Sequence, residues 1–76
     1  MSRKDNAECL RDFGDYIRTA RERLGLSQAE VANSLGLHQT YYGKIELAKR
    51  EVDLVTAMKI CEILKLDLSD FVKRYM

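Results

Sequence analysis

The 76-residue sequence lacks proline and tryptophan, and it contains no long hydrophobic run. A helix that spans a bilayer needs roughly 20 predominantly apolar residues, so we expect no transmembrane segment. Residues 1–6 are rich in charge and no apolar export segment follows them, so we expect no secretory signal and a cytoplasmic protein. With 46% hydrophobic and 33% charged residues, the chain is expected to fold in water as one compact domain.

Groups that bind metals or catalyse reactions are also scarce. Cys9 and Cys61 lie far apart without a C-x-x-C pair, and His38 is the single histidine. The sequence therefore predicts no metal site, no disulfide and no cofactor, and we expect both thiols to be reduced. It shows no nucleophile–base pair, no pair of carboxylates for acid–base work and no phosphate-binding glycine loop, which argues against an enzyme.

The charges nearly cancel, because 13 basic and 12 acidic residues give a formal net charge of +1. This balance neither indicates nor excludes a nucleic-acid partner. Residues 51–76 contain four basic and five acidic side chains, whereas residues 1–23 contain six and five, and residues 24–50 three and two. We therefore expect the C-terminal third to be the part least suited to meet an anion.

Hydrophobic spacing predicts a first helix that begins as early as Asn6 and stops at Gly25, which suits the left-handed position after a helix end. Gly14 weakens this prediction for the N-terminal half of the helix. Its inward positions recur at steps of four, three and four residues: Phe13, Ile17, Ala20 and Leu24.

Two short helices are predicted next. Ser27 and Glu30 have the spacing of a capping box, which starts a helix that ends at Gly36. After a three-residue bend, a further helix is predicted over residues 39–47, with Tyr42 and Ile45 inward. Two helices joined by a short glycine-containing bend are typical of a helix-turn-helix, here at about residues 28–47. The predicted outward side of its second helix carries Gln39, Thr40, Gly43 and Lys44.

Two more helices complete the prediction. Asp53 is the expected N-cap of a fourth helix, and Asp67 or Ser69 that of a short last one. The expected inner positions of the fourth helix are Leu54, Ala57, Ile60, Cys61 and Leu64, and the fifth helix carries the apolar residues Leu68, Phe71 and Tyr75. No strand pattern competes, so the predicted fold class is all-α: a single domain of five helices over residues 1–76, with an N-terminal extension at residues 1–10.

Residues 24–32 read LGLSQAEVA, residues 35–41 read LGLHQTY, and Ile45 and Glu46 follow. This pattern strongly resembles the lambda-repressor and Cro-like (Xre-type) helix-turn-helix DNA-binding domains, over roughly residues 13–71. The short length and residues 37–41 are also similar to controller proteins of restriction–modification systems and to short phage repressors. The resemblance implies a compact lambda-repressor-like domain that regulates transcription by binding double-stranded DNA.

The resemblance further implies that the helix over residues 39–47 lies in the major groove. There, Gln39 suits adenine, Thr40 suits a thymine methyl group and Lys44 suits guanine, with Gly43 on the same base-reading side. The residues expected to contact phosphates are Gln28, His38, Tyr41, Lys49 and Arg50. Each group also has a plainer interpretation. The base-reading residues would then be a solvated helix face, Lys49 and Arg50 would serve solubility, and His38 would be a helix cap.

Arg21 and Glu46 match the positions of a structural ion pair in the resembled family. Three departures from its pattern affect local geometry. Leu47 and Ala48 stand where a polar residue and glycine are usual, so the helix continues or places alanine in a left-handed conformation. The link near Asp53 lacks a proline. Tyr42 replaces an aliphatic residue, so its hydroxyl needs a partner or the rim of the core.

A homodimer on a palindromic operator is expected, because one domain offers few base contacts and two read half-sites about one helical turn apart. The expected dimer face is Val55, Met58, Phe71 and Tyr75, with Ile63 and Met76 beside it, although the edge of the core is an alternative for these residues. The alternative function is an antitoxin-like protein-interaction module whose main partner is another protein.

Overall fold

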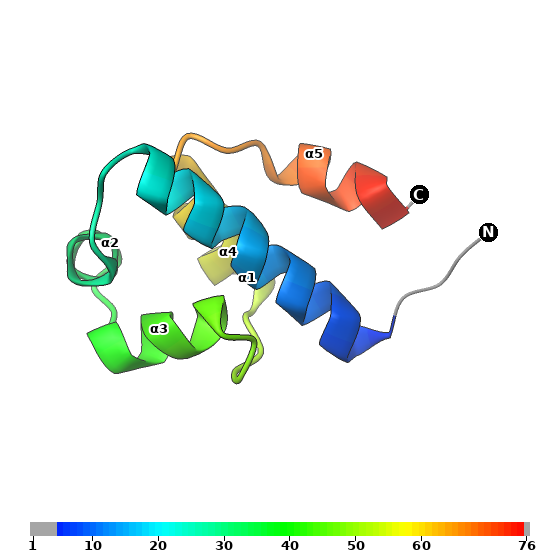
Figure 1. Cartoon of the computed structure of the whole chain (residues 1–76), viewed down its shortest axis with the longest axis horizontal. Coiled ribbons are helices and arrows are strands. Elements are labelled where there is room, and N and C mark those ends of the chain that lie inside the picture. Colours follow the sequence, from blue (N-terminus) through cyan, green and yellow to red (C-terminus); the bar gives the residue numbers. More distant parts are fainter. Residues whose placement is uncertain (1–4, 76) are drawn as a thin grey trace.

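A computed structural model describes residues 5–75. They form five α-helices and a final 3-10 turn, which confirms the all-α prediction (Figure 1). The elements are α1 (Asn6–Arg23), α2 (Gln28–Leu35), α3 (Gln39–Glu46), α4 (Leu54–Ile63), α5 (Leu68–Val72) and the 3-10 turn η1 (Lys73–Tyr75). Residues 6–10, expected as part of an extension, are the first turns of α1, and residues 1–4 and Met76 lie outside the described residues.

Polar N-cap side chains accept hydrogen bonds from the first backbone N–H groups of most of the helices. Asp5 accepts a 2.7 Å hydrogen bond from the Glu8 N–H at the start of α1. At α2 both bonds of the predicted capping box are present. Asp67, one of the two candidates for α5, accepts from the Ser69 N–H at 3.0 Å. Asp53 occupies the N-cap position of α4 as predicted, but its side chain makes no capping bond.

The helix ends depend on four left-handed residues. Gly25 (φ 72°) adopts the left-handed conformation predicted for it, and Gly36 (φ 69°) adopts the same one, which glycine reaches without strain. Ala48 (φ 60°) and Lys65 (φ 59°) adopt it despite their side chains. Of the two outcomes open for Ala48, the left-handed alanine is therefore the one that occurs, and α3 ends at Glu46.

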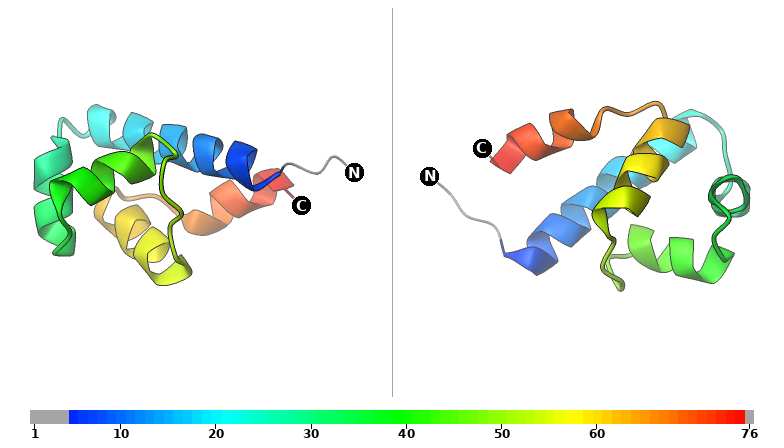
Figure 2. Two further views of the ribbon diagram at one scale, coloured as in Figure 1. Left: turned by 90° about the horizontal axis from the view of Figure 1, so that it is seen from below. Right: turned by 180° about the vertical axis from the view of Figure 1, so that it is seen from behind.

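The core lies where α1 crosses the other helices, with α3 packed on α1 and α2, and α4 packed on α2 and α5 (Figures 1 and 2). Phe13, Ile17 and Ala20 are buried as predicted, and Phe13 meets Phe71 edge-on at a centroid distance of 5.3 Å. The other buried apolar side chains among residues 5–75 are Val31, Ala32, Tyr42, Ile45, Ala57, Ile60, Cys61, Leu64 and Phe71.

Two predicted core residues are exposed. Leu24 is the C-cap of α1 and Leu54 is the first residue of α4, so both stand at helix ends where the core no longer covers them. Leu54 is 67% exposed. No helix among residues 5–75 is long and apolar enough to cross a bilayer.

The C-terminal segment packs against α1. The Tyr75 hydroxyl donates a 2.8 Å hydrogen bond to Oδ2 of Asp12. The Arg74 guanidinium lies over the Tyr16 ring at 4.8 Å from its centroid. Both cysteines are free, Cys9 half-buried and Cys61 buried, and burial raises the pKa of the Cys61 thiol to about 11.

Candidate nucleic-acid interface

Helices α2 and α3 form the predicted helix-turn-helix. Gly36 ends α2, and the Leu37 N–H returns to the Ala32 carbonyl at 2.9 Å, so the chain turns sharply before α3 begins at Gln39. Figures 1 and 2 place α3 along one edge of the bundle, with α1 behind it and α2 beside its N-terminal end.

The outer side of α3 is open to solvent. Gln39, Thr40 and Lys44 are exposed, whereas Tyr42 and Ile45 point inward and are buried. This alternation is what a helix needs to enter a groove while it stays anchored to its domain. Gly43 is half-buried, because the side chain of Gln28 reaches it from α2.

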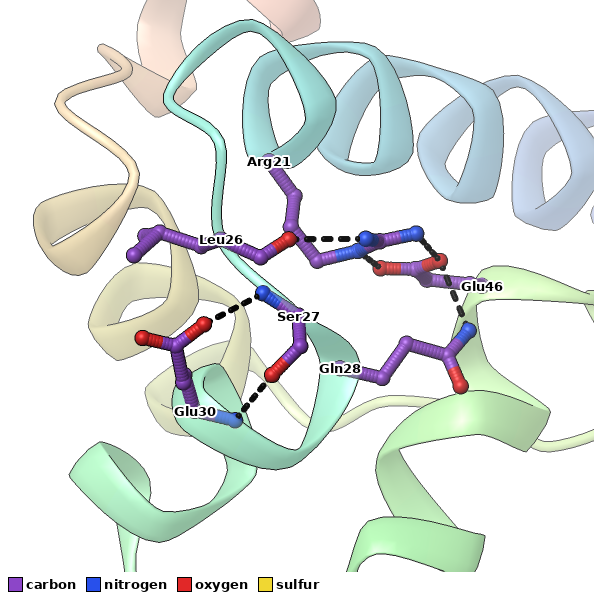
Figure 3. Close-up of polar contacts among 6 residues, drawn as sticks. All are labelled: Arg21, Leu26, Ser27, Gln28, Glu30 and Glu46. Atoms are coloured by element: carbon purple, nitrogen blue, oxygen red, sulfur yellow. Dashed lines mark hydrogen bonds and ion pairs between the residues drawn. The ribbon is translucent and has the colours of Figure 1, made fainter.

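Arg21 and Glu46 form a closely paired salt bridge between α1 and the end of α3 (Figure 3). Arg21 Nε donates to Glu46 Oε2 at 2.7 Å, and Nη2 donates to Oε1 at 3.0 Å. Nη1 of Arg21 also donates to the Leu26 carbonyl at 2.9 Å. The ion pair therefore fixes α3 both to α1 and to the loop before α2.

Glu46 is only 3% exposed, so its charge depends on its partners. Burial acts to raise the pKa of Glu46, but the hydrogen bonds from Arg21 and Gln28 are among the contacts that outweigh burial and hold it below the ordinary value. The hydrogen bonds between Arg21 and Glu46 also raise the pKa of Arg21. Both groups therefore stay ionised at neutral pH.

The Tyr42 hydroxyl lies inside the core, away from the rim that was one of its two expected environments. It is fully buried and makes no hydrogen bond of ordinary geometry among the described residues. Burial raises the pKa of Tyr42, and the neighbouring Glu46 carboxylate raises it further. Of the two expected environments, the rim of the core is therefore excluded, and the Glu46 carboxylate is the polar group that the hydroxyl contacts.

Gln28, the first residue of α2, faces the end of α3. Its Nε2 donates to Glu46 Oε1 at 3.0 Å (Figure 3). The neighbouring capping box uses the N–H groups of Ser27 and Glu30. Sequence reasoning named Gln28 and Glu46 separately and missed the bond between them, because the two residues meet only after α2 and α3 have packed.

The remaining expected phosphate contacts lie around the two ends of α3. His38 precedes the helix, and its Nδ1 accepts from the Thr40 N–H at 3.3 Å, so the predicted capping role is present. Tyr41 is half-buried, and the Arg50 guanidinium lies over its ring at 5.1 Å from the centroid. Lys49 and Arg50 are both exposed in the loop after α3.

Only part of the expected dimer face is a surface. Val55 and Met58 on α4 are 56% and 54% exposed, whereas Phe71 is buried in the core and Tyr75 is half-buried. Leu54, which the sequence placed inside, lies one turn from Met58 and extends the exposed apolar side of α4. Its position directly after an N-cap was the signal that could have identified it. Among residues 5–75, no three His, Cys, Asp or Glu side chains gather to hold a metal ion.

Comparison with known proteins agrees with this geometry. Residues 17–71 match the sequence model of the helix-turn-helix family. The chain is 40% identical over 52 residues to YonR, a prophage-derived HTH-type transcriptional regulator of Bacillus subtilis that is uncharacterised; the match covers 68% of this chain and 48% of YonR.

Two control proteins are similar over more of their length. The chain is 41% identical over 59 residues to control protein C.MunI of a Mycoplasma species, covering 76% of this chain and 80% of that protein. It is 31% identical over 62 residues to control protein C.SmaI of Serratia marcescens, covering 82% and 74%. The chain therefore spans about half of YonR and most of the two control proteins.

Proposed function

The chain belongs to the helix-turn-helix family, a family of DNA-binding regulators and not of enzymes, and from this premise we propose that it reads a palindromic operator as a homodimer. The observation that carries the proposal is the exposed side of α3, where Gln39, Thr40 and Lys44 are held outward by the buried Tyr42 and Ile45. The likeness to the two control proteins supports a role in controlling transcription.

In the proposed complex, α3 enters the major groove. Gln39 pairs with adenine through N6 and N7, Lys44 donates to guanine O6 or N7, and Thr40 packs on a thymine methyl group. Gln39 and Thr40 lie in the first turn of α3, the part of such a helix that approaches base edges.

Phosphate contacts flank this helix. Gln28 offers its side-chain amide at the start of α2, where the positive end of the helix dipole also favours an anion. His38 is the N-cap of α3 and Tyr41 lies in its first turn, while Lys49 and Arg50 follow the end of the helix. These contacts set the register of the domain on the duplex and do not choose the sequence.

Selection of bound sites from random duplexes tests this function. The purified chain is expected to enrich a two-fold symmetric sequence, with half-sites whose centres are about 34 Å apart. Gln39→Ala and Lys44→Ala should each lower affinity for the enriched site and relax the preference at one position of each half-site, at a cost of about 1–3 kcal/mol. Lys73→Ala, a charge removal on the exposed η1 turn, is the matched control and should bind as the wild type does. No enriched sequence, or unchanged preference in both α3 variants, would contradict the proposal.

The homodimer is proposed to form through the apolar side of α4. Leu54, Val55 and Met58 share the first half of this helix and are exposed, which is costly for a monomer and useful for a partner. An apolar groove of about 330 Å³ continues the surface, with Leu54 and Val72 at its edges and Phe13 and Phe71 at its base. A second copy would cover these side chains.

Sedimentation of the chain alone tests this assembly. The wild type is expected to be dimeric, and Met58→Lys should be monomeric because a dimer would bury the added charge. Thr19→Lys adds the same charge on an exposed position of α1 and should remain dimeric. A wild-type chain that is monomeric and associates only with a different protein would favour the interaction-module alternative instead.

A further inference from the structure

Gly43 is the only glycine inside α3, and the backbone does not require it. Its φ is not in the left-handed region, where only Gly25, Gly36, Ala48 and Lys65 are found among the described residues. Glycine inside a helix costs about 1 kcal/mol relative to alanine, so its presence needs another reason.

That reason is the side chain of Gln28. A Cβ atom at position 43 would lie 3.2 Å from Gln28 Oε1, 3.8 Å from Cδ and 3.9 Å from Nε2. All three atoms of the terminal amide therefore lie over Gly43, and its oxygen is closer than ordinary van der Waals contact would allow. An alanine at this position would force the amide to shift by a few tenths of an ångström from its present place.

Glu46 determines which end of this amide is the donor. A carboxylate only accepts hydrogen bonds, so the atom that faces Glu46 Oε1 at 3.0 Å must be the nitrogen. A primary amide has two N–H groups, and this bond uses one of them. The second remains for another acceptor, while Arg21 neutralises the Glu46 charge that would otherwise repel an anion.

We propose that Gly43 leaves the space in which the Gln28 amide packs, and we call this space the seat of the amide. Glu46 is then a positioning residue, which orients the second N–H of this amide toward a DNA phosphate. Gly43 thus acts on phosphate binding through Gln28 and is not itself a reader of bases. The proposal rests on the proposed function, because it assigns a partner to one side chain of the same DNA-binding surface.

A double-mutant cycle on the selected operator tests the seat. Gly43→Ala and Gln28→Ala are each expected to lower affinity about tenfold, which corresponds to losing a hydrogen bond to a charged group. In the Gln28→Ala background, Gly43→Ala should change affinity less than twofold, because no side chain is left to displace. Urea unfolding should show Gly43→Ala to be as stable as the wild type or more so, since alanine favours the helix.

Two results of this cycle would overturn the proposal. Equal losses from Gly43→Ala with and without Gln28 would mean that position 43 meets the DNA directly. Wild-type affinity in Gly43→Ala would mean that the seat is not needed. Failure of the function itself is distinguishable, because then the wild-type chain would enrich no sequence and the cycle could not begin.

Removing the charge of single DNA phosphates tests whether a phosphate is the partner of Gln28 and whether Glu46 positions the amide. Replacing single operator phosphates by methylphosphonates should reveal, in each half-site, one phosphate whose neutralisation weakens the wild type but not Gln28→Ala. Glu46→Gln, studied at a temperature where it is folded, should lose sensitivity at that same phosphate, because a glutamine no longer fixes the orientation of the neighbouring amide. Retained sensitivity in Glu46→Gln, or no phosphate specific to Gln28, would refute this part.

Discussion

Gly14 of α1 lies directly against the main-chain carbonyl of Glu46, the last residue of α3. A Cβ at position 14 would overlap that oxygen and would also approach the Ile45 carbonyl oxygen to 3.2 Å. The two helices can therefore cross at this separation only if α1 has no side chain at the crossing. The same contact holds α3, whose outer side carries the proposed base-reading residues, at its place on the domain.

Gly14→Ala is expected to destabilise the protein although alanine is the better helix former. The clash is with backbone, which cannot move aside as a flexible side chain does, so the loss of unfolding free energy should be about 2 kcal/mol or more. Urea unfolding measures it. Gly43→Ala is the matched control, because its neighbour is a flexible side chain, and it should cost nothing. Equal stability of the two variants would show that α1 and α3 can separate without penalty.

The sequence predicted helices and caps well because these depend on neighbours in the chain. The spacing of Ser27 and Glu30 and the glycine at position 36 are local signals, and both gave the correct structure. The role of Gly14 was not predictable, because its reason is a carbonyl 32 positions later in the chain. In the sequence, Gly14 only weakened the prediction of a helix at that position.

The candidate site also has features that the sequence predicts and features that it does not. The periodicity of Tyr42 and Ile45 was enough to predict which side of α3 faces out. Hydrophobic spacing was misleading for Leu54, because it identifies one face of a helix but not how far a neighbouring helix extends over it. Phe71 was expected on the dimer face and is buried in the core, because α1 packs over it. The bond from Gln28 to Glu46 needed the packed structure.

Ala48→Gly is expected to stabilise the protein. Alanine pays about 1–2 kcal/mol for the left-handed conformation that ends α3, whereas glycine adopts it freely. The greater freedom of glycine in the unfolded chain offsets about 0.5–1 kcal/mol of this gain. We expect the midpoint of thermal unfolding to rise by about 2 to 8 °C. Ala29→Gly, the same change inside α2, should lower it, and a fall in both variants would argue against strain at Ala48.

Arg21→Met should be strongly destabilising at neutral pH. It leaves the buried Glu46 charge without its main partner, which costs about 3 kcal/mol or more. Arg18→Met removes an arginine whose pair with Asp15 is exposed, so its cost should be below about 1 kcal/mol. Urea unfolding of both variants compares them, and similar losses would mean that the Arg21 pair is no more important than a surface one.

The loss in Arg21→Met should shrink as the pH falls. In the wild type the pKa of folded Glu46 lies below its ordinary value of 4.5, so its contribution to stability is present above about pH 4.5 and is lost on acidification. In the variant, burial without Arg21 should raise that pKa, so that protonation relieves the buried charge. Unfolding free energies from about pH 7 down to about pH 4 check this, and a constant difference between the two proteins would exclude it.

Arg50 and Tyr41 should affect DNA binding in different ways. The Arg50 guanidinium is held over the Tyr41 ring beside α3, and if it neutralises one phosphate per half-site, Arg50→Ala should lower the slope of log affinity against log salt by about 0.9 per contact, or about 1.8 for a dimer. Tyr41→Phe removes a hydroxyl and no charge, so it should weaken binding while the slope stays unchanged. Titrations of the selected operator across salt concentrations measure both. An unchanged slope in Arg50→Ala would leave this arginine only the role of a solubilising surface charge.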